Sequence, residues 1–193
     1  AKKALDDNFT HYVPSPGLME VREVIAEHQS DVHNKNISPE NVVFTPGAKP
    51  IMFFTIMALI EPGDEVIYPN PGFPIYESMI NYVGGKAVPM ELKEEKGFNA
   101  DVDLIEQSIS DKTKLIILNS PNNPCGSVME SADMKRVADI AKEKDIVILT
   151  DEVYKDLYFE GSHNSVYDYD GMEENVVILD GFSKSYAMTG WRL

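Results

Sequence analysis

The feature that most constrains the fold is a set of short, almost wholly apolar runs that are each followed by polar residues. Three such runs occupy residues 114–118, 146–149 and 176–179, and they consist mainly of Ile, Val and Leu. A strand that is apolar on both faces is typical of a parallel sheet covered by helices on each side. Stretches with helical spacing separate the runs, which predicts an α/β fold: a three-layer α/β/α arrangement with a mostly parallel mixed sheet.

Turn-forming residues and hydrophobic spacing predict the remaining elements. We expect further strands at 41–45, 65–68 and 86–92, and helices at 48–60, 75–82 and 131–144. Another helix is expected after the turn at 14–17, and Asp101 is expected to cap one more. In the helix at 48–60 we expect the large apolar side chains to form core; they are Met52, Phe53, Phe54 and Met57.

Composition excludes several classes of protein. The chain has 17 basic and 32 acidic residues, a net charge of −15, which argues against nucleic-acid or membrane-surface partners. The single cysteine, Cys125, forbids an intramolecular disulfide and a multi-cysteine zinc site, so we expect no metal and a reducing, cytoplasmic location. The most apolar run, 51–60, is about half the length of a membrane-spanning helix.

Ligands of parallel α/β folds bind at the carboxyl ends of the strands, which directs attention to the polar residues there. Asp151 follows a buried run, so its carboxylate needs a cationic partner unless it merely caps a loop. Lys184 follows another run; a desolvated lysine is a nucleophile toward carbonyls, although a lone lysine is usually a solvated charge. The small residues at 47–49 suit either an anion at a helix start or a tight turn.

Several segments, taken in order along the chain, resemble fold-type I pyridoxal-5′-phosphate (PLP) enzymes, specifically class I/II aminotransferases of the aspartate and aromatic type. The matching segments are 12–18 with Arg22, 46–49, 62–66, 69–76, 119–126, 150–154 and 181–192. The last is the most specific, since Arg192 follows Lys184 by eight residues.

The resemblance implies a role for each residue around the cofactor ring. Lys184 would form the Schiff base with the PLP aldehyde and then move a proton as general base and acid. Asp151 would keep the pyridine nitrogen protonated, and Asn123 and Tyr154 would hydrogen-bond the ring 3′-oxygen. Lys184, Asp151 and Tyr154 are therefore the expected catalytic residues, with Phe73 stacked on the ring.

The resemblance also implies how the phosphate is held. The backbone N–H groups of Ala48 and Lys49 would bind it at a helix start, with Ser183 adding a hydroxyl and Arg192 a bidentate contact. Tyr12 matches a tyrosine that reaches the phosphate of the neighbouring subunit. A homodimer with a shared active site follows from that match.

By this resemblance the protein transfers an amino group between an α-amino acid and an α-keto acid, in amino-acid metabolism and biosynthesis. Two alternatives share the scaffold: a PLP-dependent carbon–sulfur β-lyase, and a ligand-sensing aminotransferase-like domain of a transcription regulator. We expect residues 1–193 to be the PLP-binding large domain, truncated at both ends and without its C-terminal small domain. In the family that small domain carries the arginine that binds the substrate carboxylate.

Overall fold

The computed structural model describes residues 1–161 and 163–193, and these form two compact units, 1–45 and 46–193. The first unit contains the helices α1 (Lys2–Asp6) and α2 (Met19–His33) and the 3₁₀ turn η1 (Pro39–Asn41). Helix α2 confirms the helix expected after the turn at 14–17.

The strand expected at 41–45 does not form. Arg22, buried in α2, donates from Nε to the carbonyl oxygens of Pro39 (3.0 Å) and Val42 (2.8 Å). The backbone N–H of Phe44 donates to the carbonyl of Pro16 at 2.9 Å. An arginine side chain and the turn at 14–17 thus satisfy backbone groups of this segment, which forms no strand with any residue that the structure describes despite its β-branched composition.

The second unit alternates strands and helices as the sequence predicts. Its elements are α3 (Lys49–Leu59), β1 (Glu65–Asn70), α4 (Ile75–Tyr82), β2 (Lys86–Glu91), η2 (Glu94–Lys96), α5 (Val102–Ser108), β3 (Thr113–Asn119), α6 (Ser131–Lys144), β4 (Val147–Asp151), η3 (Val166–Asp168), β5 (Val176–Leu179), α7 (Phe182–Ser185) and η4 (Thr189–Trp191). The predicted cap of α5 is confirmed, since the Asp101 carboxylate accepts a hydrogen bond from the N–H of Asp103 at 3.2 Å.

The five strands form one sheet in the order β2-β1-β3-β4-β5, and every neighbouring pair is parallel. The sheet is thus wholly parallel rather than mixed across residues 1–161 and 163–193. In the register of its central strands, Asp151 of β4 lies opposite Asn119 of β3 and Leu179 of β5. The loops that leave these three strands therefore start side by side at one edge of the sheet.

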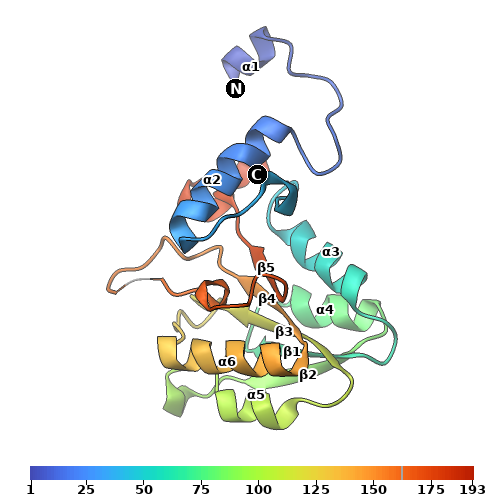
Figure 1. The fold of residues 1–193 in the computed structure, drawn as a ribbon, viewed down its shortest axis with the longest axis vertical. Helices are drawn as coiled ribbons and strands as arrows, with labels where there is room; N and C mark the ends of the chain where they lie inside the picture. The colour runs from blue at the N-terminus through green and yellow to red at the C-terminus, as the bar shows by residue number, and fades with distance from the viewer. Residues whose placement is uncertain (162) are drawn as a thin grey trace. The chain divides into compact units, whose positions relative to one another are not determined.

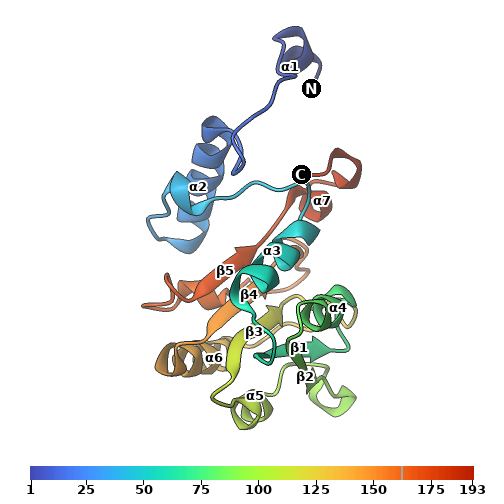
Figure 2. The ribbon, with the colours of Figure 1, turned by 90° about the vertical axis from the view of Figure 1, so that its right-hand side faces the viewer.

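Helices cover both faces of the sheet, which confirms the three-layer arrangement. On one face α3 and α4 pack on the sheet through a core that includes Ile56 and Ile80. On the other face α5 and α6 pack through a second core that includes Ile105 and Val137. Figures 1 and 2 show the two helix pairs on opposite sides of the strands. No helix in the described part of the chain has the length and apolar character needed to cross a bilayer.

Helix α3 corrects one expectation about the core. Met52 is 4% exposed, as predicted, but Phe54 is 54% and Met57 is 51% exposed. The helix is apolar on all sides, so hydrophobic spacing could not tell which side faces the sheet. Two of the four side chains expected in the core are therefore left on the surface.

We predict that Ile148→Ala lowers the free energy of unfolding by about 2–5 kcal/mol, because Ile148 is fully buried in β4, an inner strand of the sheet, and its loss leaves a cavity. Urea unfolding followed by circular dichroism measures the change. Leu157→Ala is the control: its side chain is 48% exposed, so the free energy of unfolding should fall much less than in Ile148→Ala. Equal losses in both variants would contradict the placement of Ile148.

Candidate active site

Asp151 lies at the centre of the polar residues that follow the strands. It ends β4 and is 3% exposed. Its Oδ2 accepts a hydrogen bond of 2.5 Å from the hydroxyl of Tyr76, which is itself fully buried in α4. The carboxylate is therefore oriented by a residue that lies 75 positions earlier in the chain.

The electrostatics of Asp151 are those of a charge without a counter-ion. Burial raises the pKa of its carboxyl to about 6, while the hydrogen bond from Tyr76 opposes this rise. The neighbouring carboxylates of Glu152 and Asp180 raise the same pKa further. No ion pair to Asp151 is found in the described residues, so a cationic group opposite the carboxylate would relieve the cost of burying it.

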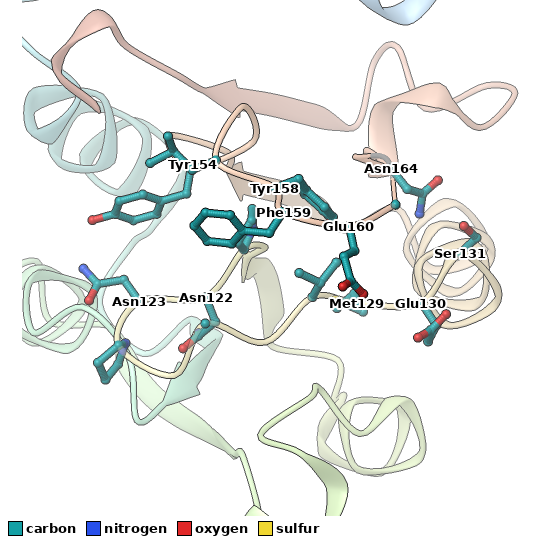
Figure 3. Close-up of a pocket in the computed structure, with 16 residues that line it drawn as sticks. Asn122, Asn123, Met129, Glu130, Ser131, Tyr154, Tyr158, Phe159, Glu160 and Asn164 are labelled. Atoms are coloured by element: carbon teal, nitrogen blue, oxygen red, sulfur yellow. The ribbon is translucent and has the colours of Figure 1, made fainter. Parts of the chain in front are cut away.

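Asn119 connects Asp151 with the loop that carries Asn123. Its Nδ2 donates to the carbonyl of Asp151 at 3.0 Å, and its Oδ1 accepts from the N–H of Asn123 at 2.7 Å. Asn123 and Tyr154 line the same groove of about 900 Å³. Figure 3 shows their polar ends at one end of that groove, as expected for two groups that share one ligand oxygen.

Lys184 is brought to the same edge of the sheet by the short helix α7, which follows β5. Its Nζ lies 5.6 Å from the centroid of the Tyr154 ring. An ammonium over an aromatic face is a favourable contact. The expected catalytic lysine and tyrosine therefore come together from two different loops.

Phe73 lies between the start of α3 and the hydrogen-bond partner of Asp151. Its ring packs edge-on against Tyr76, with centroids 6.1 Å apart and planes at 80°. Nζ of Lys49 is 5.7 Å from the centroid of the Phe73 ring. Phe73 thus contacts the side chain that hydrogen-bonds Asp151, and its stacking on a cofactor ring stays a prediction.

The start of α3 and the end of the chain form a second, cationic cluster. The guanidinium of Arg192 donates to the carbonyls of Thr189 (2.8 Å) and Pro46 (3.5 Å). It lies so close to Gly47 that a Cβ there would come within 2.4 Å of Nη2, and Gly47 has a φ of +83°. Ala48 caps α3, where the first N–H groups have no partner within the helix. Cation and helix start together suit an anion.

Two further residues predicted to bind the phosphate, Ser183 and Tyr12, do not contact the start of α3 or the Arg192 guanidinium through any hydrogen bond described above. The hydroxyl of Ser183 donates to the carbonyl of Leu193 at 3.3 Å, so it braces the Arg192 segment. Tyr12 is fully exposed and belongs to the first unit. Its contact with a neighbouring subunit stays a prediction.

A buried network anchors the loop that carries Tyr154. Oε1 of Glu152, 1% exposed, accepts hydrogen bonds from the hydroxyls of Thr150 (2.9 Å) and Ser165 (2.6 Å). Its Oε2 lies 2.7 Å from Nε2 of His163. No group of three or more metal-ligating side chains is present in the described part of the chain.

Two side chains that organise this site were assigned no role from the sequence: Tyr76 and Asn119. Tyr76 could have been suspected, because it lies about one helical turn after Phe73 on a mostly apolar face. Asn119 ends an apolar strand beside Asp151, which is also a recognisable signal.

Comparisons with known proteins agree with this geometry. The model of the family "Aminotransferase class I and II" matches residues 1–193. The chain is 40% identical, over 100% of its length, to a probable aspartate aminotransferase of Methanocaldococcus jannaschii, of which it covers 50%. It is 38% identical to aromatic-amino-acid aminotransferase 2 of Thermococcus litoralis, again over 100% of this chain and 50% of the relative.

Solved structures give the same result. The aromatic aminotransferase from Pyrococcus horikoshii superposes with a TM-score of 0.95 at 38% identity, covering 99% of this chain and 52% of that one. The Thermus thermophilus aspartate aminotransferase with maleate has a TM-score of 0.95 at 35% identity, with 99% and 50% coverage. The chain thus spans about half the length of the relatives it matches. The family is PLP-dependent, and the chain belongs to the class I and II aminotransferases.

Proposed function

We propose that the protein containing this chain is a PLP-dependent aminotransferase that moves an amino group between an α-amino acid and an α-keto acid. The observation that carries the proposal is the buried carboxylate of Asp151, held by Tyr76 and lacking a cation in the described residues. When bound, PLP supplies an aldehyde for the amino group and a cationic ring that withdraws electrons.

The donor set fits each part of that cofactor. Asp151 offers a carboxylate to a protonated ring nitrogen, and Phe73 an aromatic face near it. Asn123 and Tyr154 offer polar groups at one end of the groove. We infer that Lys184, whose amine lies over the Tyr154 ring, is the base that takes and returns the proton at the substrate Cα.

The cationic cluster is the proposed phosphate site. Arg192 and the start of α3 at Ala48 and Lys49 supply positive charge and backbone donors. Ser183 contributes by bracing the segment that carries Arg192. A local site of this kind accepts an anion although the chain as a whole carries −15, because short-range contacts dominate over the distant, screened surface charge.

The substrate and the cellular setting are also proposals. The relatives are named for aspartate or aromatic amino acids, so both are candidate amino donors in a biosynthetic reaction. We place residues 1–193 in the cofactor-binding large domain and the substrate-carboxylate anchor in the half of the relatives that this chain does not span. The single free cysteine, Cys125, supports a reducing, cytoplasmic location.

We further propose that the protein is a homodimer that uses the α3–α4 apolar patch, defined as Phe53, Phe54, Met57 and Tyr82. Phe54, Met57 and Tyr82 are 54%, 51% and 74% exposed. The ring of Phe53 lies 5.9 Å from that of Phe54 and 6.5 Å from that of Tyr82, so the patch is continuous. A continuous exposed apolar surface of this kind marks an interface. The predicted contact of Tyr12 with a neighbouring active site also requires a dimer.

Replacing Lys184 by alanine in the full-length protein should reduce transamination by at least ~10³-fold, because the proton-transferring amine is lost. Turnover is measured with aspartate or an aromatic amino acid and 2-oxoglutarate, and the absorbance of bound PLP is followed in parallel. Lys135→Ala, at an exposed lysine of α6, is the control and should retain activity. Retained turnover in Lys184→Ala, or release of pyruvate and ammonia by the parent protein without a keto acid, would refute the proposal.

The pH dependence of stability tests the role of Asp151. Its pKa is raised in the folded protein from the ordinary value of 3.8 to about 6, so its contribution to stability is full below pH 3.8 and is lost as pH rises through 6. We compare the free energies of unfolding of the Asp151→Asn variant and the parent in the cofactor-free full-length protein. The difference in favour of the variant should increase by on the order of 3 kcal/mol from pH 4 to pH 8. Urea unfolding at both pH values measures the gain.

The control for that experiment is Asp139→Asn, since Asp139 is an exposed carboxylate paired with Lys135. Its effect on stability should be small and should not grow with pH. An Asp151→Asn effect of the same size at pH 4 and pH 8 would show that the Asp151 carboxylate is not a strained charge.

Phe54→Glu and Met57→Glu should each shift the full-length protein from dimer to monomer, because each variant would bury a charge in the proposed interface. Sedimentation velocity measures the shift. Phe159→Glu, at a phenylalanine 99% exposed outside the α3–α4 apolar patch, should leave the dimer intact. Dimers that persist in both patch variants would rule out this surface.

A further inference from the structure

Lys155 is a buried lysine next to Tyr154, and it forms an ion pair with Asp180. Its side chain is 6% exposed, and its Nζ donates to Oδ2 of Asp180, whose side chain is 23% exposed. A buried lysine is uncommon, and it is retained only where a partner compensates its desolvation. The cost of placing this charge inside the unit calls for a physical reason.

The ion pair joins the two loops that carry the proposed catalytic groups. Lys155 directly follows Tyr154 in the turn after β4. Asp180 directly follows β5, and its other oxygen, Oδ1, accepts the N–H of Gly181 at 2.7 Å. Gly181 is the N-cap of α7, the helix that presents Lys184. One carboxylate thus holds both the start of that helix and the lysine next to Tyr154.

The Lys155–Asp180 pair connects the loops after β4 and β5 beyond the point where the sheet ends. The last backbone bond between the two sides runs from the N–H of Glu152 to the carbonyl of Leu179, at 2.8 Å. Past that point the two segments enter separate turns, and the Lys155–Asp180 pair bridges them. The same two turns carry Tyr154 and Lys184, whose ring and amine are 5.6 Å apart.

We propose that Lys155 is a positioning residue, which acts through Asp180 to set the placement of the Lys184 amine relative to Tyr154. This role rests on the proposed function, since it assigns Lys155 to the same site.

The test compares Lys155→Met with Lys155→Arg in the full-length holoenzyme. The first readout is the pH titration of the absorbance of bound PLP, which reports the environment of the Lys184 amine. In Lys155→Met we expect the midpoint to move by about half a pH unit or more, and kcat to fall about tenfold with KM within about twofold. Lys155→Arg keeps the cation and should restore most of both.

The control is Lys86→Met, which breaks the 2.8 Å pair of the more exposed Lys86 with Glu65 at the amino ends of β1 and β2. It should change thermal stability alone and leave the titration midpoint unchanged. A Lys155→Met protein that behaves like this control, with altered stability and a parental titration, would overturn the positioning role.

A double variant keeps the test decisive if Lys155→Met does not fold. Lys155→Met combined with Asp180→Asn leaves no unpaired charge, and asparagine can still accept the N–H of Gly181. The shifted titration should persist in the double variant, and a parental titration there would also overturn the inference. Failure of the proposed function is separately visible, because the parent protein would then show no PLP band that depends on Lys184.

Discussion

The uncompensated charge of Asp151 is the constraint on which the rest of the site depends. A carboxylate that is 3% exposed at the end of a central strand is tolerated because the fold supplies a well-placed donor, Tyr76, at 2.5 Å. Neither this donor nor the N–H of Val153, which donates to Oδ1 at 3.4 Å, neutralises the charge, and burial raises the pKa of the carboxyl to about 6. The protein therefore gives up part of its stability at a position that only a cationic ligand group completes.

The parallel sheet is what makes such a position possible. Its register sets Asp151 opposite Asn119 on one side and Leu179 on the other, so three loops begin side by side. Local side-chain bonds then shape each loop: Asn119 holds the N–H of Asn123, and Asp180 holds that of Gly181. Long-range order comes from strand pairing, and short-range order from amide and carboxylate groups at the strand ends.

Much of the fold was predictable because its signals are local. The apolar runs of β3, β4 and β5, the helix predicted at 131–144 and the Asp101 cap each depend on residues close in sequence. The strand expected at 41–45 was wrong because a carbonyl of that segment binds Arg22, a side chain twenty positions earlier. The exposed side of α3 was missed because a helix apolar all round has no period to interpret.

The residues of the candidate site also divide into those that local sequence signals predict and those that depend on distant segments. Lys184 and Asp151 are recognisable from their places after strands and from the motif resemblance. Their supports are not, since Tyr76 reaches Asp151 from another helix and Lys155 reaches Asp180 across two loops. A lysine becomes unusual only once the fold has buried it, and no spacing rule in the sequence reports burial by distant segments.

The contact of Arg192 with Gly47 has a consequence for redesign of the anion pocket. These residues come from opposite ends of the second unit, yet a side chain at 47 would occupy the space of the guanidinium. A larger residue at 47 would push aside the flexible end of the arginine, and the φ of +83° would strain that residue whatever stands at 192. Redesign of the anion pocket can therefore vary the side chain at 192 while position 47 stays glycine.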